Sequence, residues 1–243
     1  MNKNQLTIIT GAAGTLGGSI MRCLDDVQHY KFVIVKKESE ELTISADKIF
    51  INDLERIDIG LLTKEVEVLF ENFSFTKINV IHSAGFYQKF NWNNSVKDMQ
   101  IWSRMFQVHV TSLAIICQIL YPYFKHVGGG SIVAISSNLT ERCNLGSAPY
   151  IATKQALQSL IRTMAYEFGI YNIRCNVVSP GYFRSKMSQL PVEKEEKIRN
   201  KIPLKRISDA DEIATLVVSL LNDEYRYITG NTIILDGGNT IGY

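Results

Sequence analysis

The chain has 243 residues, of which 46% are hydrophobic and 21% charged, and its 26 basic and 24 acidic side chains give a formal net charge of +2. This composition predicts a folded globular protein with a sizeable core and excludes disordered, collagen-like and coiled-coil chains. No concentrated basic stripe is present, so no nucleic-acid partner is expected. The most apolar stretch, Ser112 to Phe124, is broken by Gln118 and Pro122 and is too short to cross a bilayer. It predicts a buried helix, and no membrane partner is expected.

The beginning of the chain and its cysteines bear on the cellular compartment. The first apolar segment, Leu6 to Thr10, begins too early to leave room for a signal peptide, so secretion is not expected. The cysteines at 23, 117, 143 and 175 show no C-x-x-C spacing and no neighbouring histidine cluster. Neither a disulfide framework nor a metal site is therefore expected. Both observations favour a cytoplasmic protein with reduced thiols.

Short β-branched apolar runs alternate with longer amphipathic segments along the whole chain. Because the runs are continuous, they indicate strands that are covered on both faces, as in a parallel sheet. They lie at Leu6 to Thr10, Phe32 to Val35, Lys48 to Ile51, Ile78 to His82, Ser131 to Ser136, Arg174 to Ser179 and Thr232 to Leu235. Helices are predicted near Leu16 to Leu24, Leu61 to Asn72, Asp98 to Phe124, Tyr150 to Phe168 and Asp209 to Leu221. This pattern predicts an α/β fold, a single Rossmann-like doubly wound domain over residues 1–243 with a seven-stranded parallel sheet.

A glycine-rich turn follows the first predicted strand. The sequence TGAAGTLG covers Thr10 to Gly17 and runs directly into a helical pattern. Glycine permits a tight turn and a close approach of the backbone to a pyrophosphate, and the helix N-terminus offers free N–H groups to the phosphates. Strand-to-helix turns also use glycine for steric reasons alone. The turn therefore predicts a dinucleotide site only together with its place after the first strand of a parallel sheet.

Two lysines follow the second predicted strand. An acidic residue at this place accepts hydrogen bonds from the adenosine ribose of NAD, whereas a cation suits the extra 2′-phosphate of NADP. Lys36 and Lys37 therefore favour NADP(H), with NAD(H) as the alternative. The competing interpretation is a pair of solvated surface lysines.

Three tyrosines, Tyr121, Tyr150 and Tyr182, stand four residues before a lysine. On a helix such a pair shares one face, so the phenol and the ammonium group point into one cleft. Only Tyr150, paired with Lys154, begins a long helical pattern and has a serine, Ser137, thirteen residues upstream at the end of a predicted strand. These three side chains are candidate catalytic residues.

Several spaced motifs, in order, resemble those of the short-chain dehydrogenase/reductase family, specifically its single-domain branch. They are TGAAGTLG, Asp53-Leu54, HSAG at His82 to Gly85, Ser137, the segment from Tyr150 to Lys154, NVVSPG from Asn176 to Gly181, and the terminal TGNTIILDGG. The resemblance covers essentially the whole chain. The segment KIPLKRISDADEIATLVVSLL is similar to the same region of 3-oxoacyl-[acyl carrier protein] reductases, a similarity that many subfamilies share.

The resemblance implies hydride transfer between a nicotinamide cofactor and a carbonyl compound. Tyr150 would donate the proton, Lys154 would lower the tyrosine pKa and hold the nicotinamide ribose, and Ser137 would hydrogen-bond the carbonyl oxygen. The segment after Gly181 would close on the nicotinamide. The cofactor contacts that the family pattern implies are Gly11, Gly14, Thr15, Leu16, Gly17, Lys36, Lys37, Asp53, Leu54, Ala84, Gly85, Tyr150, Lys154, Pro180, Gly181, Phe183 and Ser185.

The chain departs from the family pattern in three places. Thr15 stands where the middle glycine of the turn is expected, and His82 and Ser83 replace the two asparagines of the usual NNAG. His109 stands where the family commonly has the asparagine that helps to hold a proton-relay water, so it joins the catalytic candidates. A histidine there either binds this water and titrates near neutral pH, or is a packed helix residue in a site without turnover.

We therefore expect an NADP(H)-dependent oxidoreductase that interconverts a ketone and a secondary alcohol. The first substrate class is a 3-oxoacyl thioester, free or bound to a carrier protein, and a sugar, polyol or secondary-metabolite intermediate is the alternative. A nucleotide-binding sensor without turnover is the alternative from another class. The segment from Lys186 to Asn200 is expected to form a substrate flap. The helices Asp98 to Phe124 and Tyr150 to Phe168 pair across a two-fold axis in family members, which implies a homodimer or homotetramer.

Overall fold

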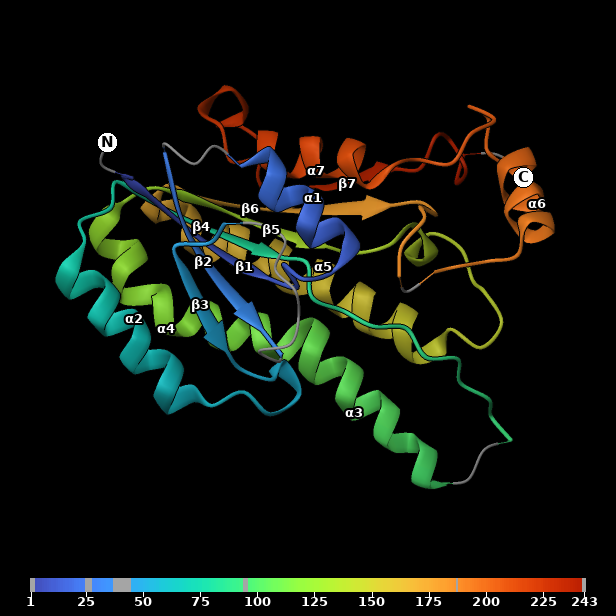
Figure 1. Cartoon of the computed structure of the whole chain (residues 1–243), viewed down its shortest axis with the longest axis horizontal. Helices are drawn as coiled ribbons and strands as arrows, with labels where there is room; N and C mark the ends of the chain where they lie inside the picture. The colour runs from blue at the N-terminus through green and yellow to red at the C-terminus, as the bar shows by residue number, and fades with distance from the viewer. Residues whose placement is uncertain (1–2, 25–27, 37–44, 94–95, 187, 242–243) are drawn as a thin grey trace.

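The computed structural model describes residues 3–24, 28–36, 45–93, 96–186 and 188–241, which form one seven-stranded sheet with helices on both faces (Figure 1). The strands are β1 (Gln5–Thr10), β2 (His29–Val35), β3 (Lys48–Ile51), β4 (Lys77–His82), β5 (Gly130–Ile135), β6 (Ile173–Pro180) and β7 (Thr232–Leu235). All pair in parallel, in the order β3-β2-β1-β4-β5-β6-β7. The predicted doubly wound fold is confirmed. Because the strand order reverses between β1 and β4, the crevice at their carboxyl ends is where such folds bind ligands.

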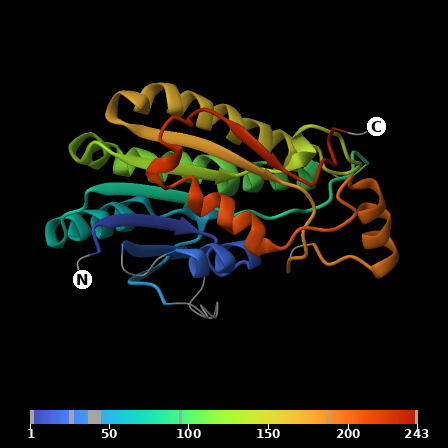
Figure 2. The same cartoon turned by 90° about the horizontal axis from the view of Figure 1, so that it is seen from above.

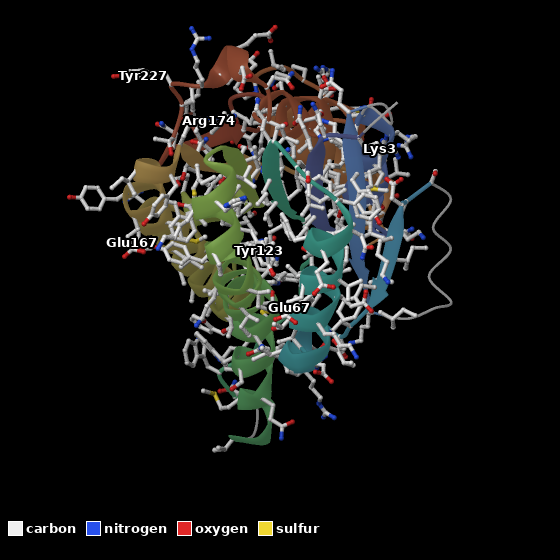
Figure 3. The ribbon with its side chains drawn as sticks, turned by 90° about the vertical axis from the view of Figure 1, so that its left-hand side faces the viewer. Lys3, Glu67, Tyr123, Glu167, Arg174 and Tyr227 are labelled. Carbon is white, nitrogen blue, oxygen red and sulfur yellow. The ribbon has the colours of Figure 1, made fainter. Side chains whose placement is uncertain are left out.

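Two apolar layers cover the sheet, because successive strand side chains point to opposite faces. In β1, Leu6 and Ile8 pack into a core with α2 (Ile59–Asn72), α4 (Ser112–Val127) and α5 (Ala148–Phe168). Ile9 packs into the opposite core with α1 (Thr15–Cys23) and α7 (Ala210–Ser219). Figure 2 shows α5 and α1 on opposite sides of the sheet. Figure 3 shows α2 beside α4, where Phe70 stacks on Tyr123 at 4.0 Å.

One long helix carries an irregular turn in its middle. α3 (Gln100–Phe106), the π-helical turn η3 (Gln107–Thr111) and α4 run without a break from Gln100 to Val127, and Gly128 ends the run with φ +67°. The run has 28 residues and is therefore longer than the apolar stretch from Ser112 to Phe124. By length and composition alone it could cross a membrane, but core helices of globular proteins can be equally long and apolar. In this chain α4 supplies Leu113, Ile116 and Leu120 to the core against the sheet.

The expected flap contains a helix that the apolar pattern does not predict. α6 (Val192–Lys201) has no buried residue and lies off the end of the sheet, on the side toward which β6 points (Figures 1 and 2). Apolar periodicity marks helices that pack on a core, so a solvated helix leaves no such signal. Short single turns complete the described chain: η1 (Leu54–Arg56), η2 (Val96–Met99), η4 (Asn138–Thr140), η5 (Gly169–Tyr171) and η6 (Asp223–Tyr225).

Candidate active site

The glycine-rich turn joins β1 to α1 at the switch point of the sheet. Gly11 has φ +73°, and a Cβ atom there would lie 2.7 Å from the backbone nitrogen of Ala84. A Cβ atom on Gly17 would lie 2.0 Å from the carbonyl oxygen of Gly11, so backbone fills this space. Gly14 precedes α1, and no side chain caps the first N–H groups of that helix. Leu16 is buried in the core, so only its backbone faces the turn. The turn therefore fits a pyrophosphate group.

Thr15 has a partner that a glycine in its place could not hold. Its Oγ1 accepts a hydrogen bond from the backbone N–H of Lys186 at 3.1 Å. Ser185, which precedes Lys186 in the chain, forms a hydrogen bond with Ser188, with 2.8 Å between the two Oγ atoms. The departure at Thr15 thus joins the glycine-rich turn to the segment that leads into the flap.

The flap itself is folded onto Glu195 of α6. The Arg184 guanidinium lies 2.8 Å from the Glu195 carboxylate, and the Tyr182 hydroxyl donates to the Ser188 carbonyl oxygen at 2.7 Å. The Arg184 guanidinium holds the pKa of Glu195 below its usual range. Tyr182, one of the three tyrosines with a lysine four residues later, therefore serves flap packing.

Lys36 at the end of β2 is paired with acidic side chains. Its Nζ lies 3.2 Å from the Asp53 carboxylate and 3.2 Å from that of Glu55, which also binds Arg104 of α3 at 2.8 and 3.0 Å. Hydrogen bonding by Arg104 is the main reason why the pKa of Glu55 is lowered to about 2. Lys37, the second predicted cation, lies outside the described residues. Lys36 is thus an exposed lysine that is ion-paired to two carboxylates.

The sequence motifs do not single out Glu55 or Arg104. Glu55 directly follows the Asp53-Leu54 motif, and this position is the one sequence signal for it. Arg104 approaches from a helix some fifty residues later in the chain, and no spacing rule predicts that meeting. Leu54 is buried in the core, while Asp53 accepts a hydrogen bond from the Glu55 N–H at 3.0 Å.

His82 fixes β1 to β4 below the turn. His82 Nε2 lies 3.1 Å from the carbonyl oxygen of Val108, which can only accept, so Nε2 carries the proton and donates. Nδ1 therefore accepts from the Thr10 hydroxyl at 2.9 Å, and Thr10 Oγ1 accepts from the Ala84 N–H at 3.2 Å. Burial lowers the pKa of His82 to about 3, which matches this neutral tautomer. A histidine thus makes the hydrogen bonds that link these strands where the family has an asparagine.

His109 uses both of its ring nitrogens within the protein. Nε2 accepts from the Phe86 N–H at 3.1 Å, so Nδ1 carries the proton and donates to Thr153 Oγ1 at 2.8 Å. The expectation of a group titrating near neutral pH is wrong, because burial and then the nearby Lys154 charge lower its pKa to about 2. A Cβ atom on Gly85 would lie 3.2 Å from Nε2, which shows how closely the backbone covers this ring. His109 is thus a neutral packed side chain.

Lys154 and Tyr150 lie one turn apart near the start of α5. Lys154 is 4% exposed, its Nζ donates to the Ile135 carbonyl oxygen at 2.8 Å, and Nζ lies 5.7 Å from the centroid of the Tyr150 ring. Burial lowers the pKa of Lys154 to about 7. Burial also raises the pKa of Tyr150 to about 12, and a hydrogen bond with Ser137 opposes that rise. Ser137 also caps η4, where its Oγ accepts from the Leu139 N–H at 3.2 Å.

One part of the implied electrostatics is corrected. Lys154 was expected to lower the pKa of Tyr150, but burial of the phenol determines its direction in this structure, and the Tyr87 hydroxyl adds to the rise. The ammonium group donates to the Ile135 carbonyl oxygen and carries a weakened charge at neutral pH, because its own pKa is near 7.

The end of β6 closes the site on the side of β7. Pro180 ends β6, and the Gly181 N–H donates to the Leu235 carbonyl oxygen at 2.8 Å. A Cβ atom on Gly181 would lie 2.8 Å from the Asp236 side chain, so glycine is needed for this approach. Phe183 bridges to Ser208 and packs on the core of α1 and α7. In the described part of the chain, no three His, Cys, Asp or Glu side chains form a group that could hold a metal ion.

The two buried histidines predict an acid-sensitive fold. Unfolded histidines bind a proton near pH 6.5, whereas folded His82 and His109 do so only near pH 3 and pH 2. Between these values the unfolded state binds more protons, so the free energy of unfolding falls as the pH decreases, by about 1.4 kcal/mol per pH unit for each histidine. We expect urea unfolding at pH 6.5 and 4.5 to show a smaller pH-dependent loss in His109→Asn than in the wild type. Equal losses in both proteins would contradict the neutral buried ring.

Comparisons with known proteins agree with the motifs. A family model described as enoyl-(acyl carrier protein) reductase matches residues 62–240. The 3-oxoacyl-[acyl-carrier-protein] reductase FabG from Thermotoga maritima is 27% identical, covering 98% of this chain and 99% of that protein. Dehydrogenase/reductase SDR family member 4 from Homo sapiens is 31% identical over 142 residues, and the match spans about half, 51%, of its length.

Solved structures share the fold. A 4-hydroxyisoleucine dehydrogenase complexed with NADH has a TM-score of 0.87 at 22% identity, covering 99% of this chain and all of the other. A complex of RhlG from Pseudomonas aeruginosa with NADP has a TM-score of 0.84, also at 22% identity, with coverage of 99% and 100%. The family model covers most of the chain, including Ser137, Tyr150 and Lys154, and the Thermotoga maritima reductase matches nearly the whole of it. The chain therefore belongs to the short-chain dehydrogenase/reductase family.

Proposed function

We propose that this protein is an NADP(H)-dependent oxidoreductase that interconverts a ketone and a secondary alcohol. The proposal rests on the proximity of Ser137, Tyr150 and Lys154 at the carboxyl end of the sheet. Beside them lies the glycine-rich turn, in which a Cβ atom on Gly11 or Gly17 would collide with neighbouring backbone atoms. A bound nicotinamide dinucleotide supplies the hydride. The turn from Gly14 to Gly17 would hold its pyrophosphate, and Asp53 with Lys36 its adenosine end.

The side chains divide the remaining chemistry among them. Reduction of a carbonyl group leaves negative charge on oxygen, which requires a hydrogen-bond donor and a proton. The Tyr150 phenol keeps its proton at neutral pH because its pKa is raised to about 12, so it is ready to give it to that oxygen. Ser137 is placed to donate a hydrogen bond to the same atom. Lys154, whose Nζ lies 5.7 Å from the centroid of the Tyr150 ring, would hold the nicotinamide ribose.

The first test is a fluorescence titration of the purified protein with NADPH and then with NADH. Tighter binding of NADPH would support Lys36 as part of the 2′-phosphate site. Failure of both cofactors to bind would leave the sensor and the enzyme equally without support. A sensor that binds cofactor without turnover is distinguished by the Tyr150→Phe variant, since it has no turnover to lose.

Cofactor preference provides a sharper prediction at Glu55. In the folded protein this carboxylate competes with a 2′-phosphate for Lys36, and Arg104 holds it in place. We expect Glu55→Gln to strengthen NADPH binding about fivefold relative to NADH, which is the scale of a partly exposed ion pair. Glu65→Gln, which removes an ion pair with Lys48 elsewhere on the surface, is the matched control. An equal change for both cofactors would contradict a role for Glu55 in the choice.

The two candidate substrate classes are each supported by the similarity of this chain to a known reductase or dehydrogenase. A 3-oxoacyl thioester, free or carried by a carrier protein, is supported by the full-length similarity to the Thermotoga maritima reductase. The alternative, another metabolite ketone, is supported by a 7alpha-hydroxysteroid dehydrogenase from Bacteroides fragilis that is 26% identical over 98% of this chain. Turnover assays with both classes of ketone decide between them.

A homodimer or homotetramer through α4 and α5 is also proposed. Between these helices lies a groove of about 550 Å³, lined by Cys117, Tyr121, Leu160, Met164 and Phe168 among others. Exposed apolar grooves of this kind mark contact surfaces in symmetric oligomers. Light scattering at micromolar concentration tests this, and a monomer would count against it.

A cytoplasmic location stays a prediction, supported by four free cysteines.

A further inference from the structure

The immediate surroundings of Tyr150 are aromatic. The Tyr87 ring stands edge to face on Tyr150 at 5.4 Å, and its hydroxyl lies 3.2 Å from Ser147 Oγ. The His109 ring covers Tyr150 from another side at 5.7 Å, with both nitrogens bonded inside the protein. The polar atoms of these neighbours are thus already paired. A substrate rich in hydroxyl groups would find few partners beside them, and leaving such groups unpaired is costly.

The aromatic surface continues along the connection from β4 to α3, which passes the start of α5 (Figure 1). The buried Phe90 ring lies 5.1 Å from Trp92 and 5.8 Å from Trp102, and the two indoles are 6.4 Å apart. The Phe90 N–H donates to the Gly146 carbonyl oxygen at 2.8 Å, which places this connection against the segment that leads into the catalytic helix. Trp92 is 75% exposed and Leu145 is 91% exposed.

We propose that the ketone substrate carries a bulky apolar ring system, which lies on Trp92 and Leu145 while its carbonyl group reaches Tyr150. This inference rests on the proposed function and names the substrate class for the same site. Large exposed apolar side chains that continue into a catalytic site mark a ligand surface. Indole presents a rigid flat face to a hydrocarbon ring at little entropic cost. Sugars and polyols are then excluded as good substrates.

A panel of three ketones tests the substrate class. The probes are trans-1-decalone, which is bicyclic and apolar, dihydroxyacetone, which is small and hydroxylated, and an acetoacetyl thioester, which is linear. We expect kcat/KM for decalone to exceed both others at least about tenfold, the scale on which apolar pockets discriminate. A higher value for either of the other probes would overturn the inference.

Variants of Trp92 test whether this side chain is responsible for the preference for decalone. Trp92→Ala is expected to lower kcat/KM for decalone about tenfold and to change that for dihydroxyacetone less than about twofold, while Trp92→Phe keeps most of the activity because a flat ring remains. Tyr227→Ala is the matched control, since Tyr227 is fully exposed and stands out from the surface far from α3 (Figure 3). Equal losses for both ketones in Trp92→Ala would contradict the role of this side chain.

Tryptophan fluorescence gives a readout that needs no turnover. Trp92 and Trp102 are the two tryptophans of the chain and both belong to this surface. Decalone added with saturating NADP⁺ is expected to quench and blue-shift the emission of the wild type, and the shift should be lost in Trp92→Phe. If NADP(H) binds but decalone leaves the emission unchanged, the inference fails and the proposed function stands. If no cofactor binds, the proposed function fails, and decalone alone still decides whether the surface binds apolar rings.

Discussion

Replacing Tyr150 by phenylalanine is expected to lower kcat by about two to four orders of magnitude while leaving the affinity for NADPH unchanged. The loss is that of the positioned proton donor, and general acid catalysis by a side chain contributes on that scale. The ring itself remains, so the edge-to-face contacts with Tyr87 and His109 persist and the fold is preserved. Initial rates on ketone substrates, compared with a cofactor titration of the same preparation, provide the measurement.

The chain offers a matched control for this substitution. Tyr121 also stands four residues before a lysine, and the Lys125 ammonium lies 5.3 Å from the centroid of its ring, yet Tyr121 lines the groove between α4 and α5. Tyr121→Phe is expected to leave kcat unchanged. A comparable loss of activity in both variants would show that the effect comes from the fold rather than from proton donation by Tyr150.

Gly17→Ala is expected to lower the free energy of unfolding by about 3 kcal/mol and to abolish cofactor binding. The added Cβ atom would stand 2.0 Å from the Gly11 carbonyl oxygen and 2.8 Å from the Ala12 Cα atom. Both neighbours are backbone atoms, which cannot swing away as a flexible side chain would, and overpacking of this kind costs about 1–3 kcal/mol or more. For a domain of this size the melting temperature should fall by about 6–12 °C.

The same substitution at Gly169 should have the opposite sign. That glycine has φ −55°, and a Cβ atom there would meet no other heavy atom within 4 Å. Alanine at such a site restricts the unfolded chain and stabilises by about 0.4–1 kcal/mol. Thermal melts of Gly17→Ala and Gly169→Ala therefore separate steric crowding from the general effect of adding a methyl group. If both variants melted at the wild-type temperature, the close packing of the turn would be refuted.

The sequence predicts the fold well because its signals are local. Continuous β-branched runs and amphipathic segments report burial directly, and all seven strands lie within a few residues of their predicted bounds. The meeting of Ser137 with Tyr150 follows from motif spacing and the parallel topology. The ion pairs of Lys36 with Glu55, and the aromatic surface around Trp92, depend on side-chain contacts between distant segments. No periodicity encodes such contacts.

His109 shows why the pKa of a side chain cannot be predicted from its position in the sequence. The sequence identifies the residue and its family position, but its pKa depends on which atoms surround the ring. Burial of the ring has the largest effect on this pKa, and the nearby Lys154 charge also disfavours protonation. Thr153 and Phe86 hydrogen-bond to the two ring nitrogens. Thr153 lies on the same helix as Tyr150 and could have been suspected, whereas the approach of the Phe86 backbone depends on the path of the loop after β4.

The π-helical turn η3 determines how the long helix would respond to the loss of a residue. A π turn holds one residue more than the α turn that it replaces. Loss of one residue between Gln107 and Thr111 would therefore restore a regular helix and leave α3 in nearly the same rotation relative to α4. The contacts of Arg104 with Glu55 and of Trp102 with Phe90 would persist. The same loss within α4, which holds no extra residue, would rotate α3 by about 100° and break both contacts, and would thus impair cofactor choice and substrate binding together.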